Sequence, residues 1–215
     1  MKNRRIGLVD IGLDPTFDVS MNFVQGILQN INAGFIDEGG RVSPTVDVDF
    51  IRSRHQGTVM SALTAPYAVL HVMSHAGHDD GEPYFLGEDG AEVSLVHLAE
   101  VLRDGGRGLQ VGAVLADGCG TGTGVWKRAF RECIQGDVTY IGTRGNIGWY
   151  EATAFSSAFY SALLRNRGRG ATQPEQALEA ADRAARAYME ITAKNCPYVA
   201  ETLTPSRRAL KAFNG

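Results

Sequence analysis

The chain has 215 residues, of which 44% are hydrophobic and 21% charged, as in an ordinary globular protein with a substantial buried core. Its formal net charge of -3 at pH 7 gives no reason to expect a nucleic-acid partner, since proteins that bind polyanions usually carry a basic excess. No apolar run approaches the roughly 18 residues of a membrane span, and three widely spaced cysteines make no disulfide framework, so we expect a cytoplasmic protein without membrane contact.

Short apolar or β-branched runs alternate along the chain with segments of helical periodicity. In chain order the expected elements are a strand over 5–12, a helix over 19–31, a strand over 46–51, a helix over 58–65, a strand over 67–74, a hairpin over 82–95 with its turn at Asp89-Gly90, a helix over 96–104, a strand over 109–117, a helix over 124–133, a strand over 137–143, and helices over 151–166 and 172–194, the last with Thr172 as N-cap. The pattern weakens from Pro197 onward, where we expect a final helix over 205–213 or a mobile end.

Strands that alternate with helices predict an α/β fold with three layers, in which helices cover both faces of a mostly parallel central sheet. No segment has the composition of a linker, so we expect a single domain over residues 1–215. In sheets of this type, functional groups gather where strands end at their carboxyl edge. Two stretches are expected at that edge, "VMSHAGH" and "LADGCGTG".

The first of these stretches lies in a cluster of three histidines, His71, His75 and His78, in a chain that has only five. A zinc site would need all three on one side, and His71 and His75 do share one face of a strand. His71 lies inside the apolar run, however, and is expected to point into a packed layer with its ring bonded to a neighbour. We therefore expect no metal at this cluster.

The second stretch, "VLADGCGTGTG", has three interpretations. It is similar to the glycine-rich turn that binds S-adenosylmethionine in class I methyltransferases, but the acidic residue of that turn is displaced by one position, to Asp117, and half the chain precedes it. Cys119 is alternatively a nucleophile, exposed at the start of a helix whose dipole favours the thiolate and served by a histidine from the neighbouring strand. In the third interpretation Cys119 packs as a small buried residue.

At this point the sequence resembles the caspase-like cysteine peptidases of clan CD, and most closely their CHAT-domain branch. The resemblance is carried by "YAVLHVMSHAGH", "VLADGCGTG", "VTYIGTRGNIGWYEATAFSSAFYSALLRN" and "QALEAADRAAR", in that order over residues 67–190. It implies a caspase-like fold, with Cys119 as nucleophile and His75 as catalytic base. His78 is the fallback base. The family usually has glycine after the catalytic histidine, and here Ala76 takes that place.

The resemblance implies acyl transfer without a cofactor. Backbone N–H groups of Ala76 and Cys119 would hold the oxyanion, and protein substrates would be cut in a bacterial defence or cell-death pathway. We expect regulation by a separate regulatory or sensor protein, by oligomerisation, or by cleavage of the chain at Arg103, Arg107 or Arg144. A catalytically silent scaffold of the same fold is the alternative to the peptidase and to the methyltransferase-like binder.

Asp117 precedes Cys119 by two residues, as in metacaspase, clostripain and separase relatives, where an acid at this place selects Arg or Lys before the cut bond. A carboxylate at the rim of a concave site would give a cation a charge-assisted hydrogen bond. Trp149 and Tyr150 are expected to wall the same pocket, and Glu151 to add a negative charge or begin its helix. In the alternative interpretation Asp117 only caps the following helix.

Overall fold

A computed structural model of the protein describes residues 5–11, 14–33, 46–87, 90, 92–165 and 174–213. Its centre is a six-stranded sheet with the order β2-β1-β3-β7-β8-β9. The strands are β1 (Arg5–Ile11), β2 (Asp47–Ser53), β3 (Tyr67–Met73), β7 (Val111–Asp117), β8 (Val138–Thr143) and β9 (Tyr198–Leu203). Neighbouring strands pair in parallel except β8 and β9, which are antiparallel.

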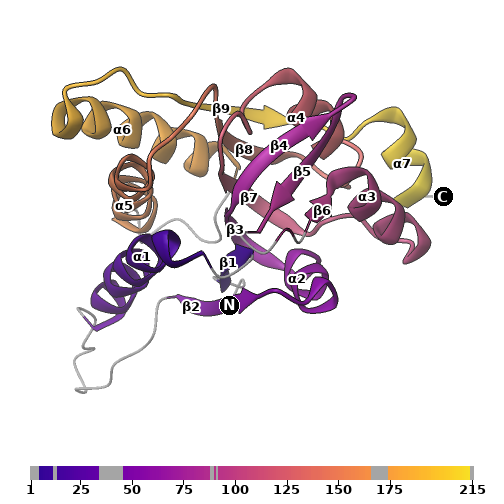
Figure 1. Ribbon diagram of the computed structural model, residues 1–215, viewed down its shortest axis with the longest axis horizontal. Coiled ribbons are helices and arrows are strands. Elements are labelled where there is room, and N and C mark those ends of the chain that lie inside the picture. The colour runs from indigo at the N-terminus through magenta and orange to yellow at the C-terminus, as the bar shows by residue number, and fades with distance from the viewer. Residues whose placement is uncertain are drawn as a thin grey trace.

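Helices cover both faces of this sheet, which confirms the predicted α/β class (Figure 1). One face carries α1 (Pro15–Ala33), α5 (Trp149–Arg165) and α6 (Pro174–Thr192). The other carries α2 (Gln56–Leu63), α3 (Leu95–Asp104), α4 (Gly124–Phe130) and α7 (Arg207–Phe213). The predicted N-cap Thr172 and turn residue Asp89 lie outside the described residues.

Each face of the sheet has its own hydrophobic core, which explains why the central strands are apolar along their whole length. On the α3 and α4 side, Trp126 packs against Phe85 with ring centroids 4.8 Å apart. On the α5 and α6 side, Phe155 stacks on Tyr198 at 3.7 Å. A strand between two cores has no polar face, so its sequence shows a continuous hydrophobic run.

A second, antiparallel sheet of three strands extends the carboxyl end of β3. It consists of β4 (His75–Asp79), β5 (Glu82–Leu86) and β6 (Glu92–Ser94). The predicted hairpin is β5 and β6, whereas β4, where no strand was predicted, pairs with β5 along its whole length. Asp80 and Gly81 form its turn with φ of 48° and 83°. An Asp-Gly pair is a typical signal for such a turn.

The tail also differs from the prediction, because residues 198–203 form strand β9 at the edge of the main sheet. An edge strand has one neighbouring strand, and most of β9 is only partly buried. Its sequence, "YVAETL", therefore lacks the apolar run that marks the central strands. Of the two alternatives for the last residues, a helix or a mobile end, the structure shows the helix, α7.

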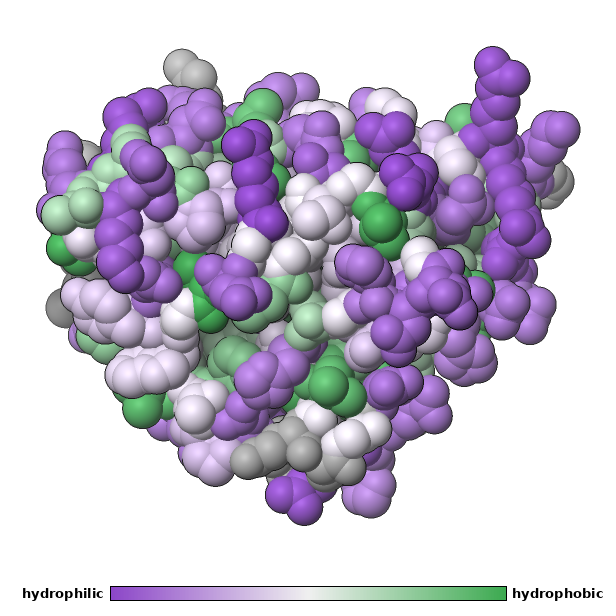
Figure 2. Space-filling model, turned by 45° about the horizontal axis from the view of Figure 1, so that its top comes forward, coloured by the Kyte–Doolittle hydropathy of each residue, from purple (hydrophilic) through white to green (hydrophobic). Residues whose placement is uncertain are grey.

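Within the described residues, no helix is long and apolar enough to span a membrane. On the face shown in Figure 2, hydrophobic side chains form scattered spots between hydrophilic ones.

Gly122 offers a test of the packing beneath the turn that follows β7. A Cβ at this position would lie 2.6 Å from Val199 Cγ2 and 2.9 Å from the Gly142 carbonyl oxygen, so strand β8 or β9 would have to move. We expect Gly122→Ala to lower the free energy of unfolding by about 1–3 kcal/mol, the usual cost of overpacking. Gly136→Ala is the matched control, since a Cβ there meets nothing within 4 Å. Equal stability of the two variants in urea unfolding would contradict this packing.

Candidate functional site

The turns that carry His75 and Cys119 leave neighbouring strands of the main sheet at the same level. Met73 of β3 lies opposite Asp117 of β7, and each of the two side chains of interest follows two residues later. The Ser74 N–H donates to the Asp117 carbonyl oxygen at 3.2 Å. A Cβ on Gly118 would lie 2.8 Å from Ala76 Cβ and 2.9 Å from the Ser74 carbonyl oxygen. The two turns are therefore packed against each other, as the crossover between these strands predicts.

The turn around Cys119 is held by hydroxyl groups of two threonines. The Thr121 hydroxyl donates to the Ala116 carbonyl oxygen at 2.7 Å, and the Thr143 hydroxyl donates to the Gly118 carbonyl oxygen at 2.6 Å. Gly120 adopts a φ of 72°, which favours glycine, and its N–H donates to the Gly145 carbonyl oxygen at 3.1 Å. The turn is thus fixed by neighbours on β7 and β8.

Cys119 itself is half-buried, and neither its thiol nor its backbone N–H bonds to any residue in the described part of the chain. A free N–H at this place can serve an oxyanion. One part of the prediction is wrong, because Cys119 does not begin a helix. Helix α4 starts five residues later, at Gly124, so its dipole does not act on the Cys119 thiol.

His75 lies at the start of β4 with its side chain 52% exposed. Its Nε2 lies 2.7 Å from the Asp14 Oδ2, and the ring packs against Phe17 with centroids 5.5 Å apart. Asp14 was not identified from the sequence as a site residue. Its position before Pro15 is a typical helix start, and β1, which precedes it, is the other neighbour of β3. These two observations together place Asp14 at the same sheet edge.

Asp14 is held as a carboxylate. Its Oδ1 accepts from the Thr16 N–H at 2.8 Å and from the Thr16 hydroxyl at 2.7 Å. Burial raises the pKa of the Asp14 carboxyl, but the hydrogen bonds from Thr16 and His75 outweigh it, so the pKa lies below its ordinary value. The group beside the His75 ring is negatively charged at neutral pH.

Asp117 lies beneath the Cys119 turn and is buried, not at an open rim. Its side chain is 3% exposed, with Oδ2 2.7 Å from the His71 Nε2 and Oδ1 accepting from the Tyr198 hydroxyl. The Tyr160 hydroxyl lies 3.2 Å from the His71 Nδ1. Burial raises the pKa of the Tyr160 and Tyr198 hydroxyls well above their ordinary value, and the charge of Asp117 adds to this. His71 is bonded within a packed layer, as we expected.

Trp149 and Tyr150 begin α5 beyond β8 and are 48% and 58% exposed. Their rings meet edge to face with centroids 6.5 Å apart. The Ser20 hydroxyl of α1 donates to the Trp149 carbonyl oxygen at 3.2 Å, which joins this segment to the helix that follows Asp14. The pair is therefore an accessible aromatic surface at the start of α5, joined to α1 through Ser20.

Glu151, in the first turn of α5, has partners of its own. One oxygen accepts from Lys194 at 2.6 Å and the other from the Gly148 N–H at 3.0 Å. These two hydrogen bonds lower the pKa of the Glu151 carboxyl, and the bond from Lys194 has the larger effect. Glu151 was predicted either to add a negative charge to the pocket or to begin its helix. The structure shows it at the start of α5, with its carboxylate paired with Lys194.

The three clustered histidines lie in three different environments. His78 lies three residues after His75 on β4, so its side chain faces the opposite side of that strand and is exposed. Ala76, between them, is half-buried. In the ranges that the structure describes, no three His, Cys, Asp or Glu side chains gather closely enough to hold a metal ion.

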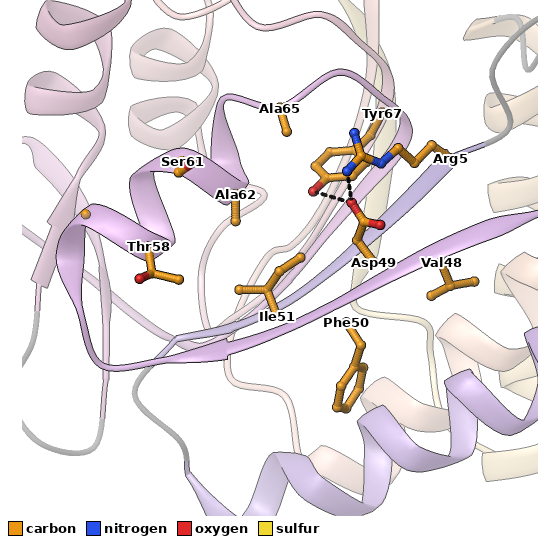
Figure 3. A pocket seen from close by; sticks show the side chains of 11 residues that line it. Arg5, Val48, Asp49, Phe50, Ile51, Thr58, Ser61, Ala62, Ala65 and Tyr67 are labelled. Atoms are coloured by element: carbon orange, nitrogen blue, oxygen red, sulfur yellow. Dashed lines mark hydrogen bonds and ion pairs between the residues drawn. The ribbon is translucent and has the colours of Figure 1, made fainter.

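A separate hollow of about 750 Å³ lies between β2 and α2 (Figure 3). At one end Tyr67 donates to Asp49 at 3.2 Å, and Arg5 pairs with the same carboxylate. Burial, with the nearby Asp49, raises the pKa of Tyr67 to about 12. Tyr67 begins β3 and His75 follows its other end, so the hollow and Cys119 lie about 20 Å apart along the strands. The lining contains neither cysteine nor histidine.

No family model matches the chain, and no curated protein matches its sequence. Among solved structures it is similar to the crystal structure of the Drosophila initiator caspase Dronc. The identity is 12%, the match covers 79% of this chain and 75% of that chain, and the TM-score is 0.37. A likeness this distant carries no argument about activity, so the function has to be argued from the residues of the site.

The buried network around Asp117 makes a prediction about stability. His71→Leu removes the donor to Oδ2 and leaves that oxygen without a partner at a site closed to water. We expect the free energy of unfolding to fall by on the order of 3 kcal/mol, as when one partner of a buried ion pair is removed. His97→Leu changes an exposed histidine on α3 in the same way and should stay within about 0.5 kcal/mol of wild type. A His71→Leu protein as stable as the control would show that the network contributes nothing.

Proposed function

We propose that the protein is a cysteine peptidase with Cys119 as nucleophile and His75 as base. The observation that carries the proposal is the packing of their two turns at the carboxyl edge of β3 and β7. An unpaired thiol and an unpaired backbone N–H at Cys119 add support, within the described residues. So does the exposure of His75, which a base that meets a substrate requires.

In the proposed reaction, His75 takes the Cys119 proton and the thiolate forms a bond to the peptide carbonyl carbon. The carbonyl oxygen becomes an oxyanion that accepts from the Cys119 N–H, with the Ala76 N–H as the second candidate donor. The imidazolium then gives its proton to the leaving amine as the C–N bond breaks. Water, deprotonated by His75, attacks the acyl-enzyme, which releases a carboxylate and restores the thiol.

For specificity, we propose a basic residue before the cut bond, with Asp117 as its acceptor. Asp117 is buried and its Oδ1 accepts from the Tyr198 hydroxyl, so an incoming cation has to displace that hydroxyl to reach the carboxylate. A guanidinium is a stronger donor to a carboxylate than a neutral hydroxyl, and its planar fork favours Arg over Lys. Trp149 and Tyr150 would line the approach.

The family resemblance also suggests control by a separate protein or by self-cleavage, and a role in bacterial defence or cell death. Of the three arginines considered for self-cleavage, Arg103 lies inside α3, whereas Arg107 and Arg144 are exposed outside helices and strands. A peptidase needs an extended segment, so we propose Arg107 or Arg144 as the better candidates.

The peptidase proposal is tested by labelling with acyloxymethyl ketone peptides that carry either Arg or Asp. We expect the Arg reagent to modify Cys119. Cys119→Ala and His75→Ala should each abolish peptide cleavage, since nucleophile and base act as a unit. His78→Ala is the matched control and should keep most of the activity, because that side chain faces the other side of β4. No labelling would favour the silent scaffold, and S-adenosylmethionine binding in calorimetry would favour the methyltransferase-like alternative.

The specificity proposal is tested by a ratio, kcat/KM on an Arg peptide over that on a neutral peptide. Asp117→Asn should lower this ratio. The loss, expressed as a free energy, should be on the order of 2–5 kcal/mol, as expected when a buried charge-assisted pair is removed. Tyr198→Phe should raise it, because the competing donor is removed while the stacking on Phe155 remains. A ratio measured within one protein does not depend on the fraction folded. Ratios unchanged in both variants, or cleavage after Asp, would overturn the proposal.

A further inference from the structure

We propose that Asp14 is a positioning residue of the reaction, holding His75 through Nε2 so that the lone pair of Nδ1 is presented to the Cys119 thiol. The inference rests on the proposed peptidase site and adds a third group to it. The Nε2 of His75 lies 2.7 Å from Asp14 Oδ2. A carboxylate accepts only, so the ring nitrogen beside it carries the proton, and the other ring nitrogen is the base.

The carboxylate of Asp14 is fixed before it meets the histidine. Its side chain is 6% exposed, against 52% for His75. Oδ1 accepts both hydrogen bonds from Thr16, one from the backbone and one from the hydroxyl. This is the arrangement of a helix N-cap, which uses one oxygen and leaves the other free for a second partner. Asp14 therefore caps α1 with Oδ1 and holds His75 with Oδ2.

Helix α1 fixes the histidine from a second direction. Phe17, whose N–H donates to the Asp14 carbonyl oxygen at 3.1 Å, lies against the His75 ring. One turn further, Ser20 donates to the Trp149 carbonyl oxygen, and its hydroxyl lies 2.5 Å from that of Thr153. The packing of α1 on α5 thus fixes the position of α1 and, with it, the position of Asp14. An exposed ring with its edge on a carboxylate and its side on a phenyl group has little freedom to turn away.

The chemistry of the proposed reaction needs this arrangement. When His75 takes the thiol proton it becomes an imidazolium, and a carboxylate 2.7 Å from its other nitrogen stabilises that charge. The proton on Nε2 stays where it is throughout, and Asp14 is not protonated in the cycle. The thiolate–imidazolium pair is therefore favoured over the neutral thiol and imidazole.

Two other sets of charged side chains, on β1, β2 and α1 and at the end of β4, have partners of their own. The Arg52 guanidinium pairs with Asp10 at 2.9 Å and also with Asp18. At the end of β4, Asp79 accepts from the Tyr84 hydroxyl at 3.3 Å. Asp14 is the carboxylate that contacts the His75 ring, and Cys119 is the ionisable group on the neighbouring turn.

The test is the pH dependence of Cys119 alkylation by iodoacetamide, followed by mass spectrometry of the modified peptide. This measures the thiolate directly and needs no substrate. Asp14→Asn keeps the helix cap, since Asn caps as well as Asp. Its amide donates to Nε2 and so favours the tautomer with the proton on Nδ1. We expect the alkylation profile to move up by about one pH unit, roughly a tenfold loss of thiolate near neutrality, toward the profile of His75→Ala.

Two controls separate this role from a structural one. Asp18→Asn removes a carboxylate one turn along α1 that pairs with Arg52, and should leave the profile unchanged. Cys196 in the same protein should be alkylated at the same rate in all variants, which reports on correct folding. If His75→Ala shifts the profile and Asp14→Asn does not, Asp14 is a helix cap alone and the inference fails. If His75→Ala does not shift it either, the His75–Cys119 pair fails, and the proposed function with it.

Discussion

A buried carboxylate joins three strands of the main sheet beneath the proposed nucleophile. Asp117 ends β7, and its two oxygens are bonded to His71 of β3 and Tyr198 of β9. A carboxylate closed to water costs several kcal/mol unless every oxygen has a donor, so these strands cannot slide past one another without breaking a costly pairing. Tyr160 of α5 adds the covering helix to the same network through the second nitrogen of His71. The register of β3 against β7 is thereby fixed. Because the turns that carry His75 and Cys119 directly follow these strands, their relative position is fixed as well.

The order of strands in the sheet is also the order of the groups in the proposed site. Strand β1 leads to Asp14, β3 leads to His75 and β7 leads to Cys119, and the sheet order is β1-β3-β7. Each group lies two or three residues beyond its strand. A proton path from thiol to imidazole, with a carboxylate behind the imidazole, thus needs no long loop. It arises because parallel strands end at one edge.

Much of the fold and part of the site could be predicted from the sequence, because burial of a strand on both faces leaves a continuous apolar run. The elements that were missed lack such a run. The central strands lie between two cores, so 67–74 and 109–117 are continuous apolar runs, and their ends could be placed at one edge. Strands β4 and β9 were missed because each lies at an edge or is exposed, where a strand needs no apolar run. The burial of Asp117 was missed because no sequence pattern shows that a tyrosine over eighty residues later returns on β9. Asp14 was missed although Asp-Pro at the start of a helix pointed to it, because the order of β1 and β3 was not used.

Two Asp–His pairs of the same length, 2.7 Å, lie near this edge of the sheet, and their surroundings give them different roles. His71 is fully buried, with both ring nitrogens taken by Asp117 and Tyr160. It has no nitrogen left for a reacting group. His75 has one nitrogen on Asp14 and an exposed ring, so its second nitrogen can meet the thiol and a leaving amine. The same chemical pair is therefore a rigid support where water is excluded, and in the proposed reaction it would hold a base where the histidine is exposed. Exposure of the histidine, rather than the length of the bond, decides which of the two pairs can act in catalysis.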